Sequence, residues 1–307
     1  MEKLLYLFIH LVLPFLLLVD VLFRSGRSKM GTIARGSSYI LALTFLYLWG
    51  QWAIIGSSYL KWLVVLIILL SARRMVINLK RRLPFFPSSV FTKILNGAGF
   101  LFAIFSAYLV FTAHQGRSSP QEGVEWNFPL GSGTYYVGSG GSNRLLNNHI
   151  RGHMTSQYYA LDINKVGPWL GVSKRMLSTT PDNHHIYGEP VFAPCAGIIT
   201  EAKSNVPDRT TSSMDVGPGD GMGNFVILDC NGVIASIPHL RQNSVAVVPG
   251  QQVAVGSYLG DIGLSGFAQE PHLHIQAAVY DQDSALVGIP ITFGSRQLVR
   301  NDIIKIE

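Results

Sequence analysis

The chain has 307 residues, enough for two domains, and 48% of them are hydrophobic. The net charge of +6 is divided unevenly: residues 1–117 hold thirteen Lys/Arg against two acids, and the rest of the chain holds eleven against sixteen. An acidic second part would repel phosphate, so the composition excludes nucleic acid as a partner and predicts a basic, apolar membrane region followed by a soluble domain.

Apolar runs within residues 1–114 predict a transmembrane anchor of about four helices. The runs are Leu4–Phe23, Tyr39–Ile55, Gly56–Ala72 and Gly97–Ala113. The first run ends in Asp20 and Arg24 without a small-residue cleavage site, so it is expected to be a retained helix and not a signal peptide. The third run is short and has Lys61 near its start, which leaves a re-entrant segment as an alternative.

The orientation of this anchor follows from its cations. Most Lys and Arg residues lie in two loops, 24–35 between the first and second runs and 73–93 between the third and fourth. The positive-inside rule makes both loops cytoplasmic, so the sequence predicts a multi-pass protein, in contact with membrane lipid, whose C-terminal domain is extracytoplasmic. His10 and Asp20 are expected to pack near helix ends, because the other runs offer no second acid or base for a proton relay.

The sequence pattern of residues 115–307 predicts β-structure. Residues 115–142 are rich in Gly and Ser and predict a linker that enters the domain through a short strand near Thr134–Val137. From 143 to 307, short runs such as YYALDI, NFVILD and HLHIQAAV predict a mostly antiparallel β-sheet domain. The letters DCNG between NFVIL and VIASI predict a hairpin turn, because Asn-Gly favours positive φ angles.

The two cysteines, Cys195 and Cys230, are too few for a disulfide scaffold. A single bridge is possible in an oxidising compartment, but two separate half-buried residues in strands are the preferred interpretation. Neither cysteine belongs to a Cys-x-x-Cys pair, so neither is expected to bind zinc.

Histidine is concentrated in the predicted β domain, where seven of the nine lie after residue 148. In the run EPHLHIQAAV, a strand would place His272 and His274 on one face, with Leu273 and Ile275 buried behind them. Two neighbouring imidazoles suit a zinc site, although chance His-x-His pairs are common on exposed strands.

Three further pieces carry candidate polar groups: RLLNNHI with His149, QYYALDI with Asp162, and VIASIPHL with His239. Taken in order with GEPVFAPCAGII, VVPGQQVAVGSYLGDIG and PHLHI, they resemble the lysostaphin/LytM-type zinc metallopeptidases, which cleave peptidoglycan peptides. The resemblance runs from about Pro129 to Val279 and includes non-catalytic glycines and prolines. It does not extend to residues 1–117.

The resemblance implies three zinc ligands and two catalytic imidazoles: His149, Asp162 and His274, and His272 and His239. Family members often space the first His and the Asp more closely, which makes His153 the alternative first ligand. His149 is preferred because Asn-x-His followed by Q-x-Y-A-L-D is itself a pattern in one branch of the family.

This ligand set agrees with the chemistry of catalytic zinc. Three protein ligands leave a fourth position for water, whose pKa zinc lowers to about 7. The sequence therefore predicts a membrane-anchored zinc metalloendopeptidase that hydrolyses peptidoglycan, or another extracytoplasmic peptide, on the outer face of a bacterial cytoplasmic membrane. The alternative is a catalytically silent envelope-binding or regulatory module of the same fold.

Overall fold

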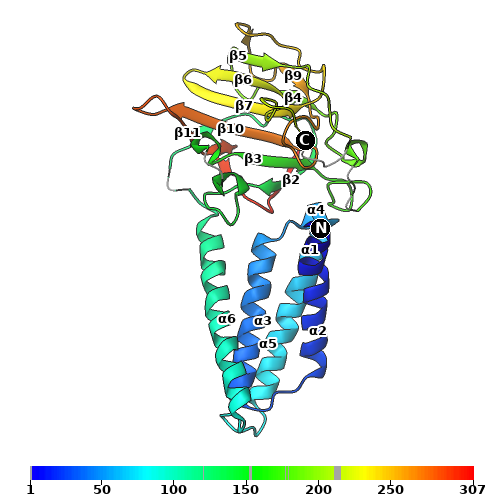
Figure 1. Cartoon of the computed structure of the whole chain (residues 1–307), viewed down its shortest axis with the longest axis vertical. Coiled ribbons are helices and arrows are strands. Elements are labelled where there is room, and N and C mark those ends of the chain that lie inside the picture. The colour runs from blue at the N-terminus through cyan, green and yellow to red at the C-terminus, as the bar shows by residue number, and fades with distance from the viewer. Residues whose placement is uncertain (1, 120, 152–153, 177, 179, 211–215) are drawn as a thin grey trace. The chain divides into compact units, whose positions relative to one another are not determined.

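The computed structural model describes residues 2–119, 121–151, 154–176, 178, 180–210 and 216–307. The chain divides into two compact units, Met1–Gln115 and Gly116–Glu307. The first unit is helical and the second is built from β-strands (Figure 1). The predicted fold class, apolar helices followed by a mostly antiparallel β domain, is confirmed.

The helical unit contains three stretches that are long and apolar enough to cross a membrane: Leu5–Phe23, Ser58–Leu79 and Val90–Gln115. The elements of this unit are α1 (Glu2–Leu7), the π-helix η1 (Phe8–Val12), α2 (Leu13–Phe23), α3 (Lys29–Trp49), α4 (Trp52–Ile55), η2 (Ser58–Leu60), α5 (Lys61–Leu79) and α6 (Val90–Gln115).

The helices differ in their ends from the apolar runs of the sequence. α3 is not among the three candidate spans, because its first half, KMGTIARGSSY, is polar. The predicted run Tyr39–Ile55 covers the end of α3 and the short α4, with a break at Gly50, whose backbone is extended. The predicted run Gly56–Ala72 begins in a turn and continues as α5 to Leu79. Apolar runs locate helices, whereas capping and packing set where they end.

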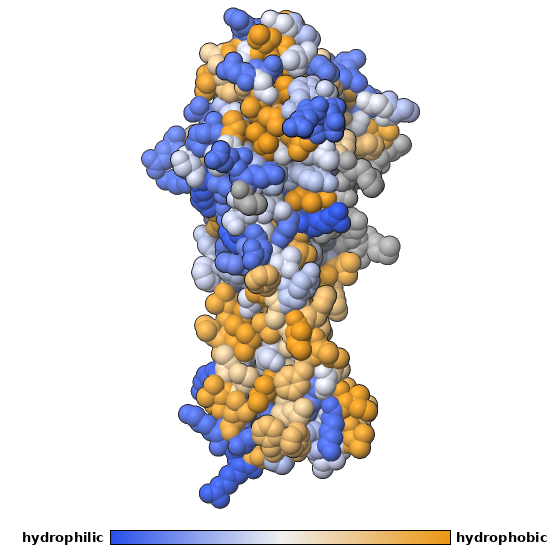
Figure 2. Space-filling model, turned by 90° about the vertical axis from the view of Figure 1, so that its left-hand side faces the viewer, coloured by the Kyte–Doolittle hydropathy of each residue, from blue (hydrophilic) through white to orange (hydrophobic). Residues whose placement is uncertain are grey.

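The two basic loops lie at the same end of the helical unit. The backbone N–H of Lys29 donates to the carbonyl of Pro84 at 2.9 Å, and that of Met30 donates to the carbonyl of Phe85 at 3.0 Å. Figure 2 shows hydrophobic side chains over most of the visible face of this unit and hydrophilic ones gathered at this end. Apolar helices with cations gathered at one end are compatible with a membrane anchor.

Both ionisable residues of the first apolar run are packed inside the helical unit. Asp20, in the last turn of α2, accepts a hydrogen bond from the Tyr39 hydroxyl at 2.9 Å and lies 3.6 Å from the guanidinium of Arg35. The ring of His10 is buried, and its centroid lies 5.2 Å from that of Trp52. Asp20 is thus paired with polar groups of α3, and the His10 ring packs against an aromatic side chain.

The β unit is built around a nine-stranded sheet with the order β14-β2-β3-β10-β7-β6-β5-β8, and β11 pairs with β10. All pairs within it are antiparallel. Its strands are β2 (Gly133–Ser139), β3 (Leu161–Lys165), β5 (Gly197–Lys203), β6 (Asn224–Cys230), β7 (Val233–Leu240), β8 (Gln252–Val253), β10 (Leu273–Tyr280), β11 (Leu286–Ile289) and β14 (Ile303–Ile306). Two smaller sheets are formed by β1 (Val124–Glu125), β12 (Ile291–Phe293) and β13 (Arg296–Gln297), and by β4 (Pro190–Phe192) and β9 (Tyr258–Asp261).

The segment expected to be a linker, 115–142, belongs to the β unit from Gly116 onward. Its strand β2 lies between β14 and β3 in the large sheet, and Tyr135, Tyr136 and Val137 are fully buried. The Gly and Ser content marks the turns around this strand. It does not reveal the burial of the strand, because burial depends on β14 and β3, which are remote in the chain.

The predicted hairpin is confirmed. Cys230 at the end of β6 pairs with Val233 at the start of β7. The two residues between them, Asn231 and Gly232, have φ angles of 57° and 91°, as a tight primed turn requires. On its other side, β7 pairs with β10. His239 lies on β7, His274 lies on β10, and His272 comes directly before β10.

Cys195 and Cys230 form a disulfide, so the preferred interpretation of two separate cysteines is wrong. Cys195 precedes β5, and Cys230 ends β6, which pairs with β5 in antiparallel register. This pairing brings the two residues, 35 positions apart, to a Cα–Cα distance of 6.0 Å. That is the ordinary separation for a bridge.

Candidate metal and catalytic site

Asp162 and His274 meet across neighbouring strands. Asp162 on β3 and His274 on β10 are partners in the antiparallel register. The Oδ1 atom of Asp162 lies 3.2 Å from Nδ1 of His274. As predicted, β10 turns Leu273 and Ile275 into the core, where both are fully buried. The alternation of the strand therefore gives His274 to the site and its neighbours to the hydrophobic interior.

His149 reaches the same carboxylate from a short 3₁₀ turn, Asn148–Arg151. Its Nε2 lies 3.0 Å from Oδ1 of Asp162, and its ring packs edge-on against that of His274 at 4.6 Å. The donor atoms of His149, Asp162 and His274 all lie within 4.8 Å of one another. Three segments remote in sequence thus converge on one point.

A buried amide, Asn147, holds the turn that carries His149. Its Nδ2 donates at 3.1 Å to each of the carbonyls of Gly141, Tyr158 and Ala160. Its Oδ1 accepts the backbone N–H of His149 at 3.0 Å. Sequence reasoning used this residue only as part of an Asn-x-His pattern and missed its structural role.

His272 lies beside the same carboxylate, with its Nε2 3.4 Å from Oδ1 of Asp162. Its other nitrogen, Nδ1, lies 2.7 Å from the carbonyl oxygen of Glu270. A carbonyl can only accept, so the network places the ring proton on Nδ1 and leaves Nε2 facing the site.

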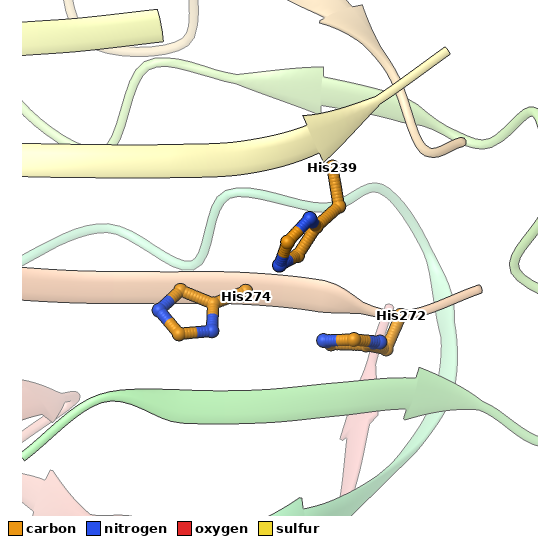
Figure 3. Close-up of side chains that lie close together, drawn as sticks. All are labelled: His239, His272 and His274. Atoms are coloured by element: carbon orange, nitrogen blue, oxygen red, sulfur yellow. The ribbon is translucent and has the colours of Figure 1, made fainter. Parts of the chain in front are cut away.

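His239 reaches the site through an irregularity of β7. The pairing of β6 with β7 shifts register between Asn224 and Val226, and His239 has a φ angle of 66°. Its Nδ1 lies 2.9 Å from the carbonyl oxygen of Ser265, and its ring centroid is 5.6 Å from that of His272. Figure 3 shows the ring directed toward His272 and His274. Such bulges re-aim side chains, and the preceding Pro238 is the sequence signal for one.

The donors fit a divalent metal ion. The far nitrogen of His274, Nε2, lies 3.2 Å from Oε1 of Gln276, just as the far nitrogens of His272 and His239 face carbonyl oxygens. In its neutral form, each ring therefore turns an unprotonated nitrogen toward the interior of the site, where the Asp162 carboxylate lies. Oriented imidazoles with outer hydrogen bonds and one carboxylate are the donor set of zinc centres.

The ionisable groups of the site strongly shift one another's pKa values. Burial alone would raise the pKa of Asp162, but the charges of His149 and His272 and their hydrogen bonds hold it well below its usual range. Burial also opposes protonation of His272, yet the charge of Asp162 raises the pKa of His272 to about 9. Burial and the neighbouring rings of His272 and His274 hold the pKa of His239 well below its ordinary value. A divalent cation at Asp162 would replace the His272 proton as the positive charge there.

The structure brings together all five preferred site residues, His149, Asp162, His239, His272 and His274. The alternative first ligand, His153, lies outside the described residues. Of the residues that sequence reasoning missed, Gln276 follows His274 at the same strand spacing that links His272 to His274. Period-2 alternation from the His-x-His pair would have found it.

One protein family matches part of the chain. Residues 182–285 match peptidase family M23. The matched range contains His239, His272 and His274, and it leaves out His149 and Asp162. No curated protein matches the chain.

Several solved structures are similar to part of the chain. A Pseudomonas aeruginosa protein described as a peptidase M23 has 22% identity over 58% of this chain and 54% of its own, with a TM-score of 0.31. A zinc-containing peptidase from Vibrio cholerae has 18% identity over 54% of this chain and 39% of its own, with a TM-score of 0.33. The catalytic domain of the antimicrobial peptidase lysostaphin from Staphylococcus simulans has 26% identity over 34% of this chain and 77% of its own, with a TM-score of 0.24. The chain thus spans about half the length of the Pseudomonas protein.

Proposed function

Because the chain contains a peptidase family M23 domain at residues 182–285, we propose that it is a membrane-anchored zinc metalloendopeptidase that hydrolyses peptide bonds of peptidoglycan. One observation carries the proposal. The donor atoms of His149, Asp162 and His274 lie within 4.8 Å of one another, beside the rings of His239 and His272. The structural needs of a β-sheet do not account for four imidazoles around one half-buried carboxylate.

The residues divide into two roles. His149, Asp162 and His274 would hold the metal, and the negative charge of Asp162 would balance part of its charge. A bound zinc ion supplies Lewis acidity toward the scissile carbonyl and a lowered pKa for water. Asp162 lies in contact with His149, His272 and His274, so its carboxylate also fixes the spacing between the two groups of residues.

His239 and His272 would move protons. Both rings are fixed by Nδ1 contacts to carbonyl oxygens and turn Nε2 toward the site. An unprotonated Nε2 can accept the proton of the attacking water, and a protonated Nε2 can donate to the oxyanion or to the leaving amine. The low pKa of His239 favours the neutral ring needed in an acceptor.

Two observations support an anchor with the catalytic domain on the outer face. The basic loops before α3 and α6 are hydrogen-bonded to each other, so both would lie on the cytoplasmic side. The chain crosses from these loops through α6 into the β unit. The disulfide between Cys195 and Cys230 also suits an oxidising, extracytoplasmic compartment.

Peptidoglycan is the proposed substrate because of the likeness to lysostaphin-type peptidases, and a secreted peptide is the alternative substrate of the same chemistry.

The test uses the full chain purified in detergent. It should contain about one zinc ion, as one ligand set provides, and release new amino termini from purified peptidoglycan. His272→Ala should keep the metal and lose the release. Zinc binding without cleavage of any wall preparation or peptide would instead identify a silent binding module.

The first ligand is tested by metal analysis of His149→Ala beside His153→Ala. We expect zinc loss from His149→Ala, because Nε2 of His149 lies 3.0 Å from Asp162. If only His153→Ala loses zinc, the proposed ligand set is incorrect while the proposed activity stands.

A further inference from the structure

One segment of the chain orients both proposed proton-transfer residues. The Nδ1 of His239 faces the carbonyl of Ser265 at 2.9 Å, and the Nδ1 of His272 faces the carbonyl of Glu270 at 2.7 Å. Both acceptors belong to the connection between β9 and β10, here called the 264–270 segment. A shift of this segment would therefore turn both rings together.

Two adjacent residues from the connection between β5 and β6 hold this segment. The Asp208 carboxylate accepts the backbone N–H of Leu264 at 3.1 Å. The backbone N–H of Arg209 donates to the Leu264 carbonyl at 3.1 Å. The guanidinium of Arg209 then donates to the carbonyl of Ala268. Arg209 thus contacts the segment at Leu264 and at Ala268. These two points bracket Ser265, and Ala268 stands two residues before Glu270.

The first half of the segment has other supports. The hydroxyl of Ser265, which is fully buried, accepts the backbone N–H of Asn224 at 2.9 Å and donates to the Leu240 carbonyl at 2.7 Å. Gly266 and Gly223 pack backbone to backbone, so closely that a Cβ on Gly266 would lie 2.4 Å from the Gly223 nitrogen. The second half, which ends at Glu270, is held by the backbone N–H of Phe267, which donates to the Gly221 carbonyl at 2.8 Å, and by the contact between Ala268 and the Arg209 side chain.

We propose that Arg209 is a positioning residue for peptide hydrolysis: its guanidinium fixes the 264–270 segment so that Ser265 and Glu270 hold His239 and His272 with Nε2 directed into the site. This inference rests on the proposed function. The contacts of Arg209 with Leu264 and Ala268 support the acceptors of His239 and His272, whereas other segments hold the candidate ligands His149, Asp162 and His274. Replacing Arg209 should therefore slow proton transfer and leave the zinc content unchanged.

The test compares Arg209→Met with Arg209→Lys in the full, zinc-loaded chain in detergent. Arg209→Met keeps the side-chain volume and removes the donor. It should lower kcat by about 10- to 100-fold, the loss that a misplacement of about 1 Å causes, with KM and zinc content unchanged. Arg209→Lys should restore most of kcat, because a single carbonyl can also accept from an ammonium group.

Lys203→Met is the matched control. It breaks the ion pair of 2.6 Å between Lys203, the last residue of β5, and Asp220, in the same connection as Arg209, and it removes no hydrogen bond to the 264–270 segment. It should keep the kcat of the wild type. An equal loss in this control would mean general loosening of the connection and would overturn the proposal.

A second readout does not depend on turnover. In zinc-loaded protein labelled with ¹⁵N at histidine, the rings of His239 and His272 should carry their proton on Nδ1, and Arg209→Met should lower that fraction. An unchanged tautomer with unchanged kcat, loss of zinc, or a raised KM at unchanged kcat would each refute a positioning role. If the wild type binds zinc but has no turnover, the proposed function fails and the tautomer measurement still tests Arg209.

Discussion

Gln276 contacts a proposed metal ligand without belonging to the ligand set. Its Oε1 lies 3.2 Å from Nε2 of His274, and the residue is 9% exposed. In metal-free protein, His274 can carry its proton on Nδ1, beside Asp162, or on Nε2. If His274 held a metal ion through Nδ1, its proton would remain on Nε2, where Oε1 of Gln276 would accept it. A change at Gln276 should therefore act on the metal-bound state alone.

The size of the effect follows from this geometry. Gln276→Met leaves the Nε2–H of His274 buried without its acceptor, which costs about 1–3 kcal/mol. That cost corresponds to a zinc affinity about 5- to 150-fold weaker, in the range of about 10- to 100-fold found for outer partners of metal ligands. Gln276→Glu keeps an acceptor and makes the hydrogen bond charge-assisted, so it should bind zinc at least as tightly as the wild type.

The assay is a competition titration of zinc between the full chain in detergent and a chromophoric chelator. Ser236→Ala serves as the control, because Ser236 is the strand partner of Gln276 and is also buried. If Gln276→Met binds zinc as tightly as the wild type, or if Ser236→Ala weakens binding equally, the reasoning about His274 is refuted.

Three further predictions concern stability. Replacing Cys195 and Cys230 by Ala should lower the free energy of unfolding by about 4 kcal/mol, the chain-entropy value for a separation of 35 residues, and reductant should then have no further effect in chemical denaturation. In metal-free protein, the stability due to the charged His272 is complete below about pH 6.5, its unfolded pKa, and is lost as the pH rises through about 9. Thermal melts with chelator at pH 6 and pH 9 should show this decline, and His272→Gln should lack it. Asn147→Ala removes the two Nδ2 protons, shared among three carbonyls, and the Oδ1 acceptor of the His149 N–H; it should cost about 3 kcal/mol, at about 1 kcal/mol for each of these three groups, with weaker zinc binding. Unchanged melting and zinc affinity would contradict the role given to Asn147.

Local sequence pattern was enough for several elements. The His-x-His run required a strand with Leu273 and Ile275 inside, and β10 has this arrangement. Asn231 and Gly232 determined the β6–β7 hairpin, because few residues adopt positive φ at both positions. Apolar length located the three candidate membrane spans, whereas the fourth predicted run, Tyr39–Ile55, is not among them. Each of these features depends on residues a few positions apart, so the sequence contains the whole physical cause.

Only the tertiary structure determined how the residues of the site come together. The register of β3 on β10 sets Asp162 opposite His274, and Asn147 places His149 beside both. The irregularity of β7 turns His239 inward, and the pairing of β5 with β6 joins the cysteines. These contacts link segments that are remote in the chain, and their geometry depends on the packing of the whole sheet. The residue types of the site could therefore be read from the sequence, whereas their distances and orientations could not.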